Sequence, residues 1–118
     1  MKTVLIAEDN QHIRDILTKR LEKSGFAVKI ADGGYAVLGY LRKNQKPDII
    51  ILDFFLPERS GIELLDSLKS KWPDTKIFVY SAHAEFETRL HLFKDHICGF
   101  FIKSDGNDKL IEAIKKEC

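Results

Sequence analysis

Residues 49–61 read IIILDFFLPERSG, an apolar run that ends at one carboxylate and is followed by a turn. The four consecutive apolar residues from Ile49 to Leu52 are typical of a strand that is buried on both faces. Such strands occur in parallel sheets that helices cover on both sides. The stretch therefore indicates an α/β protein, and it puts Asp53 at the end of a strand, at the edge of the sheet.

Strand and helix patterns alternate outward from this stretch along the chain. The expected strands are residues 4–7, 26–30, 49–52, 77–80 and 100–102. Apolar residues recur at helical spacing in five further segments, residues 13–21, 35–41, 62–68, 86–93 and 110–114. Because crossovers between parallel strands are almost always right-handed, the alternation predicts a doubly wound α/β fold with a five-stranded parallel sheet and five helices.

The composition is that of an ordinary soluble globular domain. The chain has 118 residues, 44% of them hydrophobic and 31% charged, which suffices to bury a core without metals or disulfides. A formal net charge of +1 argues against strong non-specific attraction to nucleic acid or anionic membranes. The two cysteines form no CxxC pair, and no apolar segment has the length of a membrane span or the pattern of a signal peptide. We therefore expect one cytoplasmic domain that binds neither nucleic acid nor membranes directly.

Polar side chains follow four of the expected strands. They are Glu8 and Asp9, Asp53, Ser81, and Lys103. Because ligands of open α/β sheets bind beyond the carboxyl ends of the strands, these residues mark the candidate site. Three carboxylates in one pocket repel one another unless a cation neutralises them. Magnesium prefers such oxygen ligands, and manganese would fit the same set.

The same residues suit phosphoryl transfer. With a metal bound, Asp53 can attack the phosphorus of a phosphodonor and become an aspartyl phosphate, a covalent role known for carboxylate nucleophiles. The metal, Lys103 and the Ser81 hydroxyl would then hold the phosphoryl oxygens. Each residue taken alone has a simpler interpretation as a helix cap, a turn residue or a solvated charge. Their joint occurrence at four strand ends favours the phosphoacceptor interpretation.

These motifs resemble the receiver domain of two-component response regulators over essentially the whole chain. The matching residues are Glu8-Asp9-Asn10, Asp53 with Leu56-Pro57 and Ser60-Gly61, Ser81-Ala82, and Lys103-Ser104. The resemblance implies one receiver domain over residues 1–118, with the flavodoxin-like strand order 2-1-3-4-5.

The resemblance also implies roles for single residues. The implied magnesium ligands are Glu8, Asp9, Asp53 and the backbone carbonyl of Phe55. The family's phosphate-contacting hydroxyl falls on Ser81 and its invariant lysine on Lys103. The switch aromatic, three residues before that lysine, falls on Phe100, which would act together with Ser81.

The chain departs from the family pattern at several positions. Glu8 stands where aspartate is also common, and its longer side chain would reach the metal through water. Phe100 lacks the hydroxyl of the tyrosine often found at the switch position, so packing alone would drive the switch. Ser104 replaces a frequent proline. The two positions that tune phosphoryl lifetime in the family carry Phe55 and His83, and we expect bulky Phe55 to impede the attacking water.

The function implied by the resemblance is a signalling switch in a phosphorelay. Asp53 would accept a phosphoryl group from a histidine kinase or phosphotransfer protein, with magnesium as cofactor. The domain would catalyse its own phosphorylation and dephosphorylation without being an enzyme for another substrate. Output would pass through the face built by the helix over residues 86–93, the strand over residues 100–102 and the helix over residues 110–114. Family members often dimerise or bind targets through this face.

Two other functions compete with this one. A phosphohydrolase can also use a strand-terminal aspartate as nucleophile, but it would want a second acid at the position of Phe55. A receiver-like binding module that is never phosphorylated would not need the acids together with Ser81 and Lys103. A nucleotide-binding protein is disfavoured because Gly33-Gly34 is not part of a GxGxxG or Walker pattern.

Overall fold

The computed structural model describes residues 1–82 and 95–117, and they form one five-stranded parallel sheet. The strands are β1 (Thr3–Ala7), β2 (Ala27–Ala31), β3 (Ile49–Leu52), β4 (Lys76–Ser81) and β5 (Gly99–Ile102). Their order across the sheet is β2-β1-β3-β4-β5. The predicted doubly wound sheet and its 2-1-3-4-5 order are therefore confirmed.

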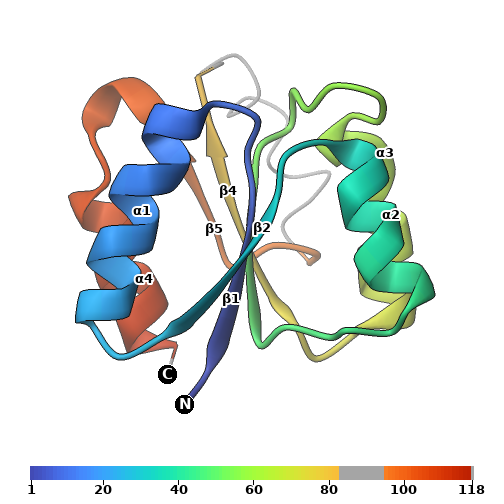
Figure 1. Ribbon diagram of the computed structural model, residues 1–118, viewed down its shortest axis with the longest axis horizontal. Helices are drawn as coiled ribbons and strands as arrows, with labels where there is room; N and C mark the ends of the chain where they lie inside the picture. The colour runs from blue at the N-terminus through green and yellow to red at the C-terminus, as the bar shows by residue number, and fades with distance from the viewer. Residues whose placement is uncertain (83–94, 118) are drawn as a thin grey trace.

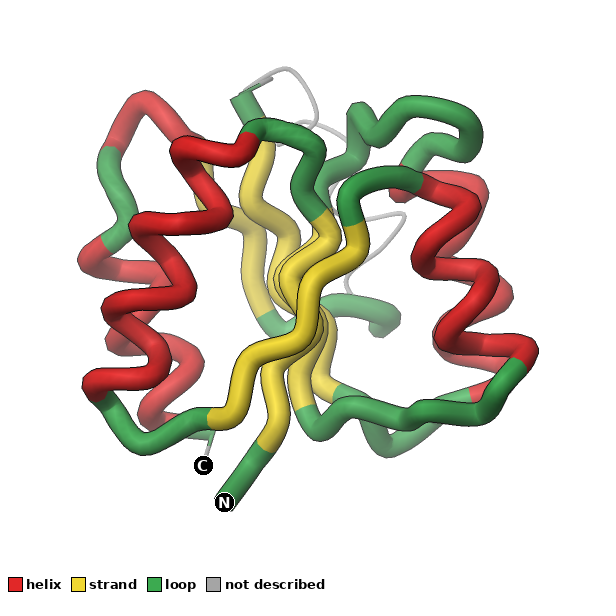
Figure 2. The backbone as a smooth tube through the Cα atoms, viewed as in Figure 1, coloured by secondary structure: helices red, strands yellow, loops and turns green. Residues whose placement is uncertain are grey.

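Helices cover both faces of the sheet, as Figures 1 and 2 show. They are α1 (Gln11–Lys23), α2 (Gly34–Arg42), α3 (Gly61–Lys71) and α4 (Asp108–Lys116), with a short 3-10 turn at Lys103–Asp105. Helices α1 and α4 lie on one face, and α2 and α3 lie on the other. The described residues thus contain four α-helices. The additional helix predicted from Phe86, Leu90 and Phe93 lies outside them.

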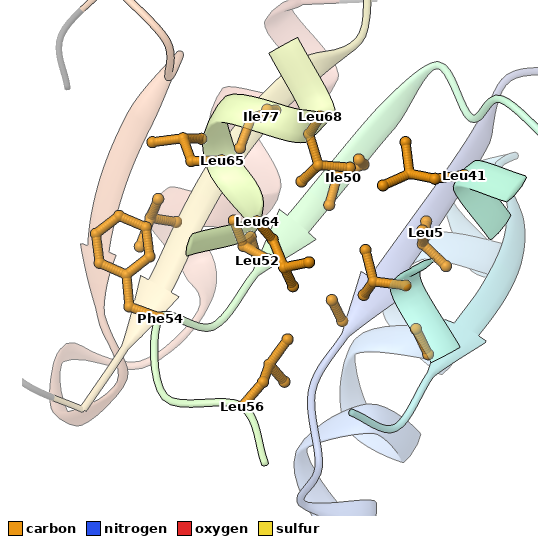
Figure 3. Packing of buried hydrophobic residues seen from close by; sticks show 14 of the residues in the cluster. Leu5, Leu41, Ile50, Leu52, Phe54, Leu56, Leu64, Leu65, Leu68 and Ile77 are labelled. Carbon is orange, nitrogen blue, oxygen red and sulfur yellow. The ribbon is translucent and has the colours of Figure 1, made fainter. Parts of the chain in front are cut away.

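Two apolar clusters, one on each face of the sheet, make up the core. Leu64, Leu65 and Leu68 of α3 pack with Ile50 and Leu52 of β3 on the α2–α3 face (Figure 3). The other two residues of β3, Ile49 and Ile51, belong to the cluster on the α1–α4 face. All four side chains of β3 are at most 1% exposed. The unbroken apolar run in the sequence is therefore the run of a strand that is covered on both sides.

The sheet order places the carboxyl ends of β1 and β3 side by side. Strand β1 pairs with β2 on one side and with β3 on the other, and Ala7 lies opposite Leu52 in the β1–β3 register. The chain therefore leaves these two strands in opposite directions across the sheet, which opens a crevice between the loops that follow them. The residues after Ala7 and Leu52 line that crevice.

Capping residues start two of the helices next to the crevice. The side chain of Asn10 accepts a hydrogen bond from the Ile13 N–H at 3.0 Å, and the Ser60 hydroxyl accepts one from the Glu63 N–H at 3.2 Å. Asn10 thus occupies the N-cap position of α1. Both caps satisfy backbone donors that a helix start leaves unpaired.

Gly61 lets α3 begin directly against the end of β3. A Cβ atom at Gly61 would lie 2.4 Å from the Asp53 carbonyl oxygen and 2.8 Å from the Phe54 Cα. The Gly61 N–H donates to the Phe54 carbonyl at 3.0 Å. The first residue of α3 is therefore in backbone contact with the residues at the end of the central strand.

We predict that Gly61→Ala lowers the free energy of unfolding by about 1–3 kcal/mol, because backbone atoms must move to admit the methyl group. Gly39→Ala, inside α2, is the matched control, since a Cβ there meets no atom within 4 Å. Gly39→Ala should raise the free energy of unfolding by about 0.5–1 kcal/mol, because alanine favours the helical conformation more than glycine does. Urea unfolding of both variants measures the effects, and equal changes would contradict the proposed backbone contact.

Candidate functional site

The carboxyl ends of three strands meet at one ammonium group. Glu8 follows β1, Asp53 follows β3 and Lys103 follows β5. The Lys103 Nζ lies 2.6 Å from Glu8 Oε1 and 2.8 Å from Asp53 Oδ2. These residues were predicted to share one pocket, and the structure brings them together.

Both carboxylates are buried and held at each of their two oxygens. Glu8 is 2% exposed and Asp53 is 5% exposed. Besides the lysine, each accepts a hydrogen bond from the backbone N–H two residues ahead: Asn10 donates to Glu8 Oε2 at 3.1 Å, and Phe55 donates to Asp53 Oδ1 at 2.9 Å. The two acids therefore have matching environments, with charge from the same lysine and a fixed orientation from the following turn.

Burial changes the titration of this pair of opposite charges. Burial raises the pKa of Glu8, although its hydrogen bonds with Lys103 and the Asn10 N–H oppose the rise. Burial by itself would lower the pKa of Lys103, but the hydrogen bonds to Asp53 and Glu8 outweigh it, so that pKa is raised. Lys103 therefore stays charged at neutral pH. Ionised Glu8 sits where negative charge is costly, which favours binding of a cation beside it.

Asp9 completes a group of carboxylates that suits a hard metal ion. One oxygen each from Glu8, Asp9 and Asp53 lies within 4.8 Å of the others, and Asp9 is exposed where the other two are buried. Oxygen-only donors of this kind fit Mg²⁺, which keeps several waters and uses few carboxylates. The donor set therefore fits the predicted metal, with its open side at Asp9.

The loop that carries the acids is fixed by Arg14 of α1. The Arg14 guanidinium donates to the carbonyls of Glu8 and Asp9 at 3.1 and 2.9 Å. The sequence interpretation did not find this contact, because an arginine on an amphipathic helix has no feature that separates it from a solvated charge. The contact holds the backbone of the first acidic pair against the start of the helix.

Ser81 lies on β4 and Phe100 on β5, the two strands that follow β3 in the sheet order. Ser81 ends β4, is fully buried and lies opposite Ile102 in the β4–β5 register. The ring of Phe100 on β5 meets the ring of Phe54 edge-on, with centroids 6.1 Å apart. Phe54 directly follows Asp53, so an aromatic contact joins the candidate phosphoacceptor segment to β5.

Of the two predicted lifetime-tuning residues, the structure describes only Phe55. Phe55 follows Phe54 in the loop after β3, and its side chain is 46% exposed. Phe55 is therefore an exposed aromatic residue two positions after Asp53 in the chain. His83 lies outside the described residues.

In the described ranges, 1–82 and 95–117, no helix combines the length and the apolar character needed to cross a bilayer.

A family model of the response regulator receiver domain matches residues 4–115. Among curated proteins, the putative response regulator NtrX-like of Rickettsia felis is 30% identical over 118 residues, covering 98% of this chain and 24% of that protein. The transcriptional regulatory protein CreB of Escherichia coli K12 is 40% identical over 89 residues, covering 75% of this chain and 38% of that protein. The chain thus spans well under half the length of these two relatives.

Solved structures agree with this match. The response regulator protein TrrA from Thermotoga maritima, in complex with Mg(2+)-BeF, is 28% identical with a TM-score of 0.87, and each chain is covered completely. A CheY-like receiver domain protein from Methanospirillum hungatei is 26% identical with a TM-score of 0.88, covering 99% of this chain and 93% of that one.

We predict opposite effects of Asp9→Asn without and with magnesium. Without metal, less repulsion from Glu8 and Asp53 should raise the free energy of unfolding by about 0.2–1 kcal/mol. In the wild-type chain, magnesium at about ten times its Kd should add about 1.4 kcal/mol. The Asp9→Asn variant should lose most of that gain, which urea unfolding with and without magnesium measures.

Asp66→Asn is the control for this prediction, because Asp66 is an exposed acid on α3. It should respond to magnesium as the wild-type chain does. A full magnesium response in the Asp9→Asn variant would contradict the metal site.

Proposed function

The chain belongs to the response regulator receiver family, and we propose that it is a phosphorylation-dependent signalling switch whose phosphoacceptor is Asp53. The observation that carries the proposal is the position of Asp53, a buried carboxylate that shares Lys103 with Glu8 and lies beside Asp9. The phosphoryl donor would be the phosphohistidine of a histidine kinase or phosphotransfer protein. Receiver domains are signalling domains, so no other substrate is proposed.

The proposed reaction takes place at the Asp53 carboxylate. One carboxylate oxygen attacks phosphorus, the bond from phosphorus to the donor nitrogen breaks, and an acyl phosphate forms on Asp53. Lys103 then donates to a phosphoryl oxygen, and the Ser81 hydroxyl at the end of β4 donates to another. Hydrolysis of the acyl phosphate by water returns the carboxylate. This chemistry would be the domain's own catalysis of phosphorylation and dephosphorylation.

Magnesium is the proposed cofactor, and it would neutralise negative charge between the acids and the phosphoryl group. Its protein ligands would be Glu8, Asp9, Asp53 and the Phe55 carbonyl. The carboxylate cluster supports this assignment, and so does the Mg(2+)-BeF complex of the TrrA protein. Manganese would fit the same donors.

The proposed output passes from Asp53 to the face that includes β5 and α4. Phe100 on β5 packs against Phe54, so a shift of the segment after Asp53 changes the packing of β5 without a tyrosine hydroxyl. Such a change is a population shift between two packings. We propose Ser81 and Phe100 as the switch residues, and the face as a surface for targets or a homodimer. The output face as predicted from the sequence also includes residues 86–93, which lie outside the described residues.

We further propose that residues 1–118 form one receiver domain acting in the cytoplasm, without direct contact to nucleic acid or membrane. The matched regions make up only 24% of the NtrX-like protein and 38% of CreB. The output activity of a longer protein of this kind would lie outside residues 1–118.

We predict that incubation with magnesium and a small acyl phosphate adds one phosphoryl group to the wild-type chain, seen by intact mass spectrometry. Asp53→Asn should show no adduct, because it removes the nucleophile. Lys103→Met should accept phosphate far more slowly, because it removes the cation that balances the developing charge. Asp66→Asn should label as the wild type does, and an adduct that survives in the Asp53→Asn variant would place the acceptor elsewhere.

We predict that Phe55→Asn shortens the lifetime of the acyl phosphate about fivefold, equivalent to about 1 kcal/mol of barrier. The proposed physical reason is that the bulky, exposed Phe55 side chain impedes the water that attacks the acyl phosphate. Phe55→Leu keeps an apolar side chain and should change the lifetime less. Decay of the purified phosphorylated chain measures the rates, and equal lifetimes in all three proteins would contradict the screening role.

His83 is proposed as the second lifetime-tuning residue.

A further inference from the structure

Glu58 has a backbone conformation that its residue type rarely adopts. It lies in the loop between β3 and α3 with φ at +73°, in the left-handed region that favours glycine. Strained positions of this kind persist where surrounding contacts hold them. The contacts made by the Glu58 side chain are therefore the candidates for what holds this conformation.

The Glu58 carboxylate caps a helix that has no cap of its own. Glu58 Oε1 accepts a hydrogen bond from the Tyr35 N–H at 3.2 Å, in the first turn of α2. Gly33 occupies the N-cap position of α2 and has no side chain with which to accept that bond. Negative charge is also favourable at a helix N-terminus. The start of α2 is thus satisfied by a residue 23 positions further along the chain.

The Gly33-Gly34 pair, which is not a phosphate-binding motif, makes room for this contact. A Cβ at Gly33 would lie 2.6 Å from Glu58 Oε1. At Gly34 it would lie 2.6 Å from the Arg59 backbone nitrogen. The Gly34 N–H donates to the Pro57 carbonyl at 3.0 Å. Residues 57–59 therefore lie directly against the start of α2, at the edge of the sheet where the loops after the strands run (Figure 1).

The same loop carries the groups that orient Asp53. The Phe55 N–H donates to Asp53 Oδ1 at 2.9 Å, and the Phe55 carbonyl is a proposed metal ligand. We propose that Glu58 is a positioning residue: by capping α2, it holds the loop after β3 so that Phe55 stays in place for Asp53 and the metal. The metal part of this inference rests on the proposed function, whereas the link from Glu58 to Phe55 does not.

Three substitutions at Glu58 separate positioning from stability. Glu58→Ala removes the cap, whereas Glu58→Gln keeps an oxygen acceptor. Glu58→Gly removes the cap but also relieves the strained φ, so global stability should recover relative to the alanine variant. Each 118-residue variant is measured by amide hydrogen exchange without metal, by magnesium calorimetry and by urea unfolding.

We expect the alanine variant to exchange its Tyr35 and Phe55 amide protons about tenfold faster than wild type, with little change at Leu5 in the sheet. Its magnesium Kd should rise about tenfold, as for other supports of metal ligands. The glutamine variant should stay within about twofold of wild type in both readouts. The glycine variant should match alanine in exchange and Kd despite its recovered stability.

Two results would overturn the inference. Unchanged Phe55 exchange in the alanine variant would show that the cap does not hold the loop. Recovery of the magnesium Kd together with stability in the glycine variant would reduce Glu58 to a purely structural role. If wild type took up no phosphoryl group, the proposed function would fail, but exchange at Tyr35 and Phe55 would still decide whether Glu58 positions the loop.

Discussion

The candidate site depends on one ammonium group between two buried carboxylates. Lys103 contacts Glu8 and Asp53, which are nearly inaccessible to water. Two buried carboxylates side by side are costly without a cation, because both lose hydration and they repel each other. The lysine supplies positive charge 2.8 Å from Oδ2 of Asp53, the residue proposed to attack phosphorus. A metal ion at the open side would add to this charge balance and would not replace the lysine.

The sheet order explains why that cation has a long side chain. Glu8 and Asp53 follow neighbouring strands, but β4 separates β3 from β5. Strands β3 and β5 are thus about 9.6 Å apart, twice the usual spacing, and only a long side chain spans that gap. The four-carbon stem of Lys103 reaches across the end of β4, where Ser81 lies. The hydroxyl proposed to contact the phosphoryl group is therefore on the strand that the lysine crosses.

The sequence predicted the features that depend on pattern and on strand ends. An unbroken apolar run predicted β3, and the shared edge of parallel strands predicted that Glu8, Asp53 and Lys103 would meet. It did not predict the cap from Glu58 to α2, because that contact depends on side-chain reach between segments 23 residues apart. In the sequence, Gly33-Gly34 was notable only for lacking a phosphate-binding pattern. Its packing role depends on which loop lies against it, and local composition does not contain that information.

The contact between Phe54 and Phe100 bears on how a switch without a tyrosine hydroxyl can work. Phe54 is 1% exposed, and its carbonyl accepts the Gly61 N–H at the start of α3. Its ring meets Phe100 edge-on across β4. Closely packed interiors respond to displacement by changing to another packing arrangement, since they contain little free volume. Under the proposed function, a shift at Asp53 would move Phe54 and so change the rotamer preference of Phe100. Shape would then transmit the signal without a new hydrogen bond.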